Sequence, residues 1–126
     1  MVYNKEPILV LWDIVKTLTT IPAYKQVMDE DEDSIPASYL LLRSEVSDTV
    51  KTFGDGTTQT RQADCDIILI SKGTAPNSTD LHNTNKALVD ARLKSLEIAF
   101  TGVNNGYDNS SLTTEYTWTF LINYVK

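Results

Sequence analysis

The sequence predicts an α+β fold, with a mixed, mainly antiparallel sheet of about four to five strands, two helices packed on one face and a long projecting β-hairpin. Three observations lead to this prediction. Apolar residues recur at helical spacing in two separate segments, a glycine-containing turn signal lies between two β-type runs, and the last segment alternates between two kinds of residue. Helices and strands do not alternate regularly along the chain, which favours an antiparallel sheet.

The size and charge of the chain narrow its class. Its 126 residues suffice for one domain, and 41% hydrophobic with 22% charged residues is ordinary for a soluble globular protein. The formal net charge of −6 argues against nonspecific binding to nucleic acid and against docking on anionic membranes. We also expect no sequence-specific binding to nucleic acid, and no apolar run is long enough to span a membrane. One cysteine and one histidine are too few for a disulfide or a zinc site. We therefore expect a single domain over residues 1–126 that holds no cofactor and no metal.

The first predicted helix covers residues 7–19. Pro7 suits the first helical position, where its missing N–H group has no partner to lose. The pattern ends before Pro22, because the residue before a proline avoids the helical conformation. The expected buried face consists of the apolar residues at helical spacing, which are Ile8, Leu11, Trp12, Val15 and Leu18.

An acidic run and a short strand follow this helix. Residues 29–33 are predicted to form a solvated loop, because consecutive like charges repel one another. The run consists of Asp29, Glu30, Asp31, Glu32 and Asp33. Tyr39–Leu42 has apolar residues on both faces, which is typical of a strand in the centre of a sheet.

Residues 46–72 are predicted to form a hairpin around the turn Gly54-Asp55-Gly56. The returning arm is polar and threonine-rich as far as Gln62 and becomes apolar from Cys65. Thr57–Ser71 would extend about 50 Å, whereas a compact chain of this length is about 35 Å across. The hairpin must therefore bend, break or project, and its polar tip favours an arm that is used in assembly. The candidate interface residues are Val50, Thr52, Phe53, Gly54, Asp55, Gly56, Thr57, Thr58, Gln59, Thr60 and Arg61.

The second half of the chain predicts a helix and a long strand. The helix covers residues 79–96. Its expected buried face has Leu81, Leu88, Ala91 and Ser95 along one side, widened by Val89, Leu93 and Leu96. A short extended segment at 98–100 is expected to break at Gly102–Gly106. Residues 113–125 predict the final strand, with its core face formed by Tyr116, Trp118, Phe120, Ile122 and Tyr124.

Few residues offer catalytic chemistry. No serine or cysteine nucleophile stands in a recognisable motif with His82, which is predicted to face solvent near the start of the second helix. Cys65 is predicted to be a buried strand thiol. Asp64 and Asp66 lie on one face of a strand, where paired carboxylates suit Mg²⁺ and phosphoryl chemistry, but the same pattern fits acids that rim a sheet in water. We therefore predict no enzymatic activity.

The order of the elements resembles that of a known family. The chain resembles the small tail-terminator and tail-to-head joining proteins of long-tailed (siphovirus) bacteriophages, particularly phages of Gram-positive hosts, over nearly its whole length. The segments that carry the resemblance are the helix Pro7–Leu18, the strand Tyr39-Leu40-Leu41-Leu42, the hairpin around Gly54-Asp55-Gly56 with its return through Cys65–Leu69, the helix Asp80–Leu96 and the aromatic strand Tyr116–Phe120.

The resemblance implies a structural virion protein and no catalytic residues. It implies a homo-hexameric ring, formed in isolation or only on the tail, that caps the tail tube and joins it to the head. The implied partners are other copies of the chain, the major tail tube protein and a head-completion or neck protein. The implied location is the tail or neck of the virion, after assembly in the host bacterial cytoplasm. The ring contacts would fall on the hairpin and on the acidic loop at 29–33.

Three alternatives remain open at this point. The first is another neck or tail-completion protein, or a tail-tube-related subunit. The second is a metal-dependent phosphoryl-transfer enzyme that uses Asp64 and Asp66. The third is a monomeric binding module that uses an exposed aromatic or acidic surface.

Overall fold

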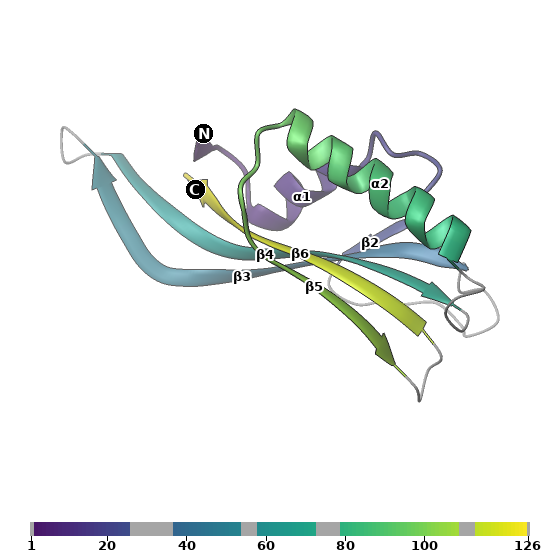
Figure 1. Cartoon of the computed structure of the whole chain (residues 1–126). Helices are drawn as coiled ribbons and strands as arrows, with labels where there is room; N and C mark the ends of the chain where they lie inside the picture. Colours follow the sequence, from purple (N-terminus) through teal and green to yellow (C-terminus); the bar gives the residue numbers. More distant parts are fainter. Residues whose placement is uncertain (1, 26–36, 54–57, 73–78, 109–112, 126) are drawn as a thin grey trace.

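A computed structural model describes residues 2–25, 37–53, 58–72, 79–108 and 113–125. Two helices lie on one face of a six-stranded sheet, which confirms the predicted α+β class (Figure 1). The helices are α1 (Pro7–Val15) and α2 (Thr79–Ser95). The strands are β1 (Val2–Tyr3), β2 (Ala23–Lys25), β3 (Ser38–Phe53), β4 (Thr58–Lys72), β5 (Phe100–Asp108) and β6 (Thr113–Tyr124).

The sheet is mixed and mainly antiparallel, as predicted. Its strand order is β1-β6-β4-β3-β2, and β5 also pairs with β6. The four long strands pair antiparallel, whereas β1 lies parallel to β6 and β2 parallel to β3. The sheet has more strands than predicted because β1 and β2 were not expected. They have only two and three residues. Such short segments show no alternation of their own and become strands by pairing with a longer neighbour.

The predicted strand Tyr39–Leu42 and the first arm of the predicted hairpin form one continuous strand, which is a correction. This strand, β3, pairs with β4 from Ser38 opposite Ser71 to Phe53 opposite Thr58, with a register shift between Val46 and Val50. The prediction of two separate strands was wrong. The polar residues after Leu42 continue the alternation of the strand between its two faces, so the strand does not end there. The turn residues 54–57 lie outside the described residues, and the projection of the hairpin as an arm stays a prediction.

The aromatic face of β6 forms the centre of the core, as predicted. Trp118 and Phe120 are fully buried, Ile122 and Tyr124 are nearly so, and Tyr116 is half-buried. Residues of both helices and of the two central strands pack against this face. They include Val10, Leu11, Ile14, Val15, Leu40, Leu42, Ala63, Cys65, Ile67, Leu69, Val89 and Leu93. Alternation along β6 therefore identified the core face of the strand before the fold was known.

Helix α1 is shorter than predicted and turns a partly different face to the core from the one predicted. It ends at Val15, and the backbone N–H of Lys16 donates to the carbonyl of Trp12. Its buried residues are Pro7, Val10, Leu11, Ile14 and Val15. The prediction that Trp12 is buried was wrong, since its side chain is 36% exposed and its ring lies 5.0 Å from the ammonium group of Lys25. A helix that is apolar on nearly all sides leaves its orientation to the packing partner.

Helix α2 presents a different face to the sheet from the one predicted, although its extent agrees with the prediction. Val89 and Leu93 are fully buried as expected. Leu81, Leu88 and Leu96 are 50%, 41% and 36% exposed, and Ala91 and Ser95 are exposed as well. The inward face instead includes two polar residues, His82 and Asn85. This correction determines where the buried polar groups of the protein lie.

Strand β5 continues through the segment that was expected to break it. Phe100 to Asp108 pairs with β6, with a register shift between Phe100 and Gly102. The break was predicted from glycine and asparagine, which favour turns in isolation. Pairing with the long aromatic strand β6 outweighs this weak local preference, since β-propensity depends strongly on context.

The end of α2 contains a residue in the left-handed conformation, which leads to a first testable prediction. Glu97 has a φ of 57°, and the N–H groups of Ile98 and Glu97 donate to the carbonyls of Leu93 and Lys94. This is a Schellman motif, in which the left-handed position favours glycine. We expect Glu97→Gly to raise the free energy of unfolding by about 0.5–1 kcal/mol, because the Cβ strain disappears.

Urea denaturation measures this change, and Glu97→Ala is the control because alanine keeps the Cβ atom. Equal stability of the glycine and alanine variants would contradict the explanation.

Candidate functional site

A cluster of buried polar side chains joins α2 to the ends of the two central strands. Ser38 begins β3, and Ser71 lies opposite it near the end of β4. His82 and Asn85 stand three residues apart on α2 and therefore share one helix face. All four side chains are at most 6% exposed. We call these four residues the buried polar cluster.

Hydrogen bonds connect the four side chains in a chain. Nδ2 of Asn85 donates to Oγ of Ser38 at 2.9 Å. The hydroxyl oxygens of Ser38 and Ser71 are 2.9 Å apart, and Oγ of Ser71 lies 2.7 Å from Nδ1 of His82. Two arrangements of protons satisfy every link. Either Ser38 donates to Ser71 and Ser71 donates to an unprotonated Nδ1 of His82, or the Nδ1–H group donates to Ser71 and Ser71 donates to Ser38. Both arrangements contain a neutral imidazole.

The environment of His82 favours this neutral form. Burial lowers the pKa of His82 below its usual 6.5, and the positive charge of Lys86 lowers it further. The prediction that His82 faces solvent was therefore wrong. A sequence signal did exist, since His82, Asn85, Val89 and Leu93 fall on one helical face.

The close contact between Ser71 and His82 has the composition of a nucleophile and its base. The burial of both residues argues for a different role, since Ser71 is 2% and His82 5% exposed. A nucleophile has to reach its substrate, whereas these groups lie between helix and sheet. The cluster therefore holds the first turns of α2 against the sheet and satisfies polar groups that would be costly to bury alone.

Asp64 and Asp66, the candidates for phosphoryl chemistry, lie on the sheet face opposite the helices. The carboxylate of Asp66 is already engaged: Thr119 Oγ1 donates to Oδ1 at 2.8 Å, and Arg43 lies 3.5 Å from Oδ2. Asp64 is exposed, and both acids line a surface cavity of about 430 Å³ together with Arg43 and Glu45. Within the described ranges, no three side chains of the histidine, cysteine, aspartate or glutamate type gather as metal ligands do.

Cys65 is buried in β4, as predicted. Its side chain is fully buried, and burial together with the charges of Asp66 and Asp64 raises the pKa of Cys65 to about 12. A thiol in this state is protonated at neutral pH and unreactive as a nucleophile. Cys65 is therefore a packing residue of the core.

The candidate assembly residues fall in the outer parts of β3 and β4. Residues 50–53 pair with residues 58–61, whereas Gly54, Asp55, Gly56 and Thr57 lie outside the described residues. The second candidate contact, the acidic loop of Asp29, Glu30, Asp31, Glu32 and Asp33, also lies outside the described residues. Strand β6 reaches β4 only as far as Arg61. Among the described strands, residues 58–60 therefore have β3 as their sole neighbour.

Comparison with known proteins does not assign a family. The sequence matches no family model and no curated protein. In the part of the chain that the structure describes, no helix combines the length and apolar character needed to cross a membrane.

Proposed function

We propose that the protein is a structural subunit of a bacteriophage virion: a tail terminator whose copies form a hexameric ring on the tail tube and join it to the head. The observation that carries the proposal is the pairing of β3 with β4. Their outer parts, residues 50–53 and 58–60, pair with each other and with no third described strand. A two-stranded ribbon is marginal alone in water, so a neighbouring subunit is the natural partner for it.

The chemistry of the described polar groups supports an assembly role rather than catalysis. Asp66 is bound to Thr119 and Arg43, Cys65 is a buried thiol, and the pair of Ser71 and His82 lies inside the fold. The net charge of −6 suits a ring through which DNA has to slide. A ring requires two different, complementary surfaces on each copy, because its contacts are heterologous. The partners in this proposal are other copies, the tail tube protein and a neck protein.

Deletion of residues 52–60 tests the proposal. We expect the full chain to form six-fold rings in electron micrographs, with a mass by light scattering six times that of the 14.1 kDa chain. The deletion should remain monomeric, because it removes the contact. If the rings close only on the tail, the same comparison is made after co-expression with the tail tube protein of the same genome.

Two results would contradict different parts of the proposal. An unchanged oligomer after the deletion would exclude the hairpin as the contact. Monomers of the full chain that neither form rings nor bind tail tubes would exclude the terminator role. A variant in which residues 29–33 are changed to the corresponding amides tests the acidic loop separately.

A further inference from the structure

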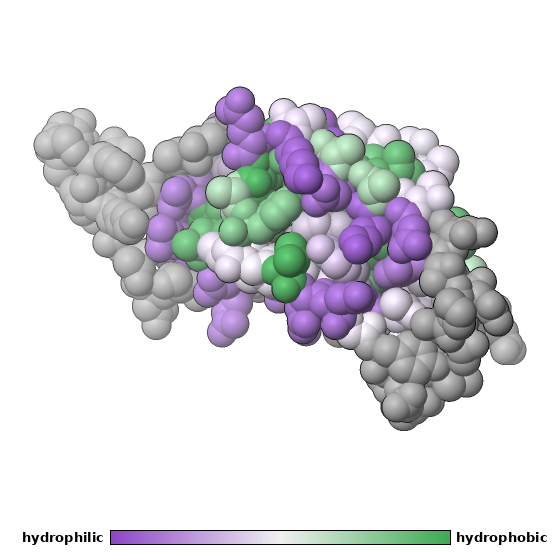
Figure 2. All heavy atoms as spheres, in the orientation of Figure 1, coloured by the Kyte–Doolittle hydropathy of each residue, from purple (hydrophilic) through white to green (hydrophobic). Residues whose placement is uncertain are grey.

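A cavity of about 260 Å³ opens between the N-terminal segment, α1 and the last turns of α2. Its walls combine apolar and charged side chains. The apolar part includes Tyr3, Val10 and Leu96, and the charged part is formed by Lys5, Asp13 and Arg92. Figure 2 shows hydrophobic side chains among hydrophilic ones on this side of the molecule, around the place where Figure 1 draws α1.

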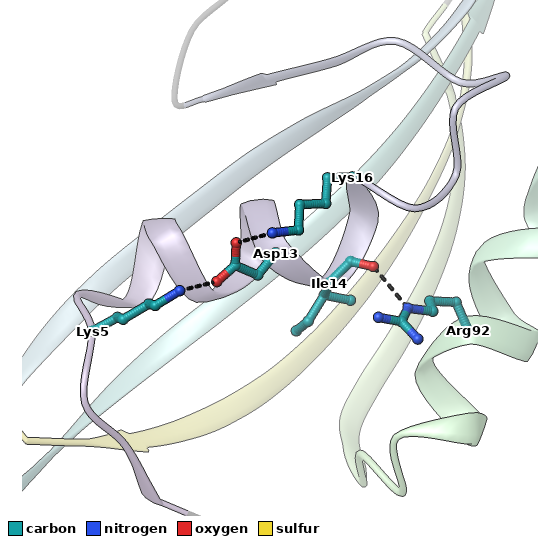
Figure 3. Close-up of polar contacts among 5 residues, drawn as sticks. All are labelled: Lys5, Asp13, Ile14, Lys16 and Arg92. Atoms are coloured by element: carbon teal, nitrogen blue, oxygen red, sulfur yellow. Dashed lines mark hydrogen bonds and ion pairs between the residues drawn. The ribbon is translucent and has the colours of Figure 1, made fainter.

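Arg92 is held in place but keeps most of its donors available. Its Nε donates to the backbone carbonyl of Ile14 at 2.9 Å, near the end of α1 (Figure 3). This bond uses one of the five N–H donors of a guanidinium and fixes the plane of the group. Among the described residues, no other group accepts a hydrogen bond from Arg92. Within the described part of the chain, the two terminal nitrogens therefore have no acceptor, and the side chain lines the cavity.

The charges around the cavity favour an anion. Lys5 and Lys16 bind the two oxygens of Asp13 at 2.5 and 2.9 Å. Hydrogen bonds from these two lysines lower the pKa of Asp13, so its carboxylate is ionised at neutral pH. The charged residues that line the cavity are the cations Lys5 and Arg92 and the anion Asp13. The lining thus has one more positive than negative charge, in contrast with the net charge of −6 of the whole chain.

We propose that this cavity binds a carboxylate attached to an apolar group. The terminal nitrogens of Arg92 match the two oxygens of a carboxylate in a bidentate arrangement, which a lysine cannot reproduce. The apolar group lies against Tyr3, Val10 and Leu96. A free aromatic or aliphatic acid has this chemistry, and so does the C-terminal residue of a peptide with an apolar side chain. The inference is independent of the proposed function.

Titration of the ¹⁵N-labelled full chain with benzoate, followed by NMR, tests the site. We expect saturable shifts at the amides of residues 3–5, 10–14 and 92–98, and no saturation with benzamide, which has the same shape without the charge. Arg92→Lys should weaken benzoate binding by about tenfold, because it keeps the charge but loses the fork. Arg43→Lys is the matched control, since Arg43 lies on the opposite face of the sheet, and it should leave the affinity unchanged.

A second variant keeps the test decisive if Arg92→Lys disturbs α1. Lys5→Gln removes one cation at the mouth and should weaken benzoate binding a few-fold, roughly as expected for a screened surface charge. Failure of benzoate to saturate at millimolar concentrations, equal binding of benzamide, or unchanged affinity in both variants would overturn the proposal.

Acetyl-Gly-Phe and its C-terminal amide distinguish the two sources of the carboxylate. Tighter binding of the free peptide acid than of benzoate identifies a chain end as the ligand class, whereas weaker binding identifies a small acid.

Discussion

Replacing Trp118 with alanine is expected to lower the free energy of unfolding by about 3–5 kcal/mol, since this is the usual effect of emptying a buried aromatic site. Trp118 is fully buried at the centre of the core face of β6. Its ring packs against Tyr116 at 4.7 Å, and its indole Nε1 donates to Asp90 at 3.4 Å. The variant therefore loses packing and leaves Asp90 without one of its donors. Urea denaturation followed by circular dichroism measures the change.

A control on the same strand separates core packing from local strand effects. Leu121 also lies on β6 but is 44% exposed. Leu121→Ala should lower the free energy of unfolding by less than about 1 kcal/mol. Trp118→Phe, which refills most of the site, should fall between the two. Similar losses for Trp118→Ala and Leu121→Ala would contradict the assignment of Trp118 to the core.

The stability of the protein is expected to fall as the pH drops below the usual histidine range. The folded chain holds the pKa of His82 below 6.5, so the unfolded chain binds a proton at a pH where the folded chain does not. The contribution of His82 to the free energy of unfolding is therefore constant above about pH 7.5 and decreases as the pH falls through 6.5 towards the lower folded pKa. In the charged imidazolium, Nδ1 can only donate to Ser71, and the positive charge lies on a side chain that is 5% exposed.

Urea denaturation at a series of pH values between 7.5 and 5 measures this loss. His82 is the only histidine, so the variant His82→Gln should show no decrease over the same interval. Carboxylates change the stability of the protein at a lower pH than His82 does. The pKa values of Asp13 and Asp90 are lowered from 3.8, so their contribution disappears only as the pH falls below that value. A decrease that persists in His82→Gln would show that another group is responsible.

Two kinds of pattern were read correctly from the sequence. The alternation of β6 identified its core face, because period-two patterning with aromatic residues leaves one orientation for a strand on a core. The burial of Cys65 followed in the same way from the apolar run in β4. Local pattern was sufficient in both places, since β6 alternates strictly and the run in β4 is apolar on both faces, with Ile67 to Ile70 all buried.

The faces of the helices were not determined by local pattern. Helix α2 contains two stripes with helical spacing, one through Leu81, Leu88 and Ala91 and the other through His82, Asn85, Val89 and Leu93. Hydropathy favoured the first, but the second packs against the sheet. The choice depends on Ser38 and Ser71, which lie far away in the sequence and require polar partners when buried.

The cavity proposed to bind a carboxylate could not be predicted from the sequence either, because it forms only in the tertiary structure. Lys5 and Asp13 pair within the N-terminal segment, but Arg92 joins them only because α1 packs beside the end of α2. The sequence by itself therefore determined the α+β class, the extent of α2 and the core face of β6. Tertiary structure decided which helix faces are buried and which charges come together, because both depend on partners that no local spacing specifies.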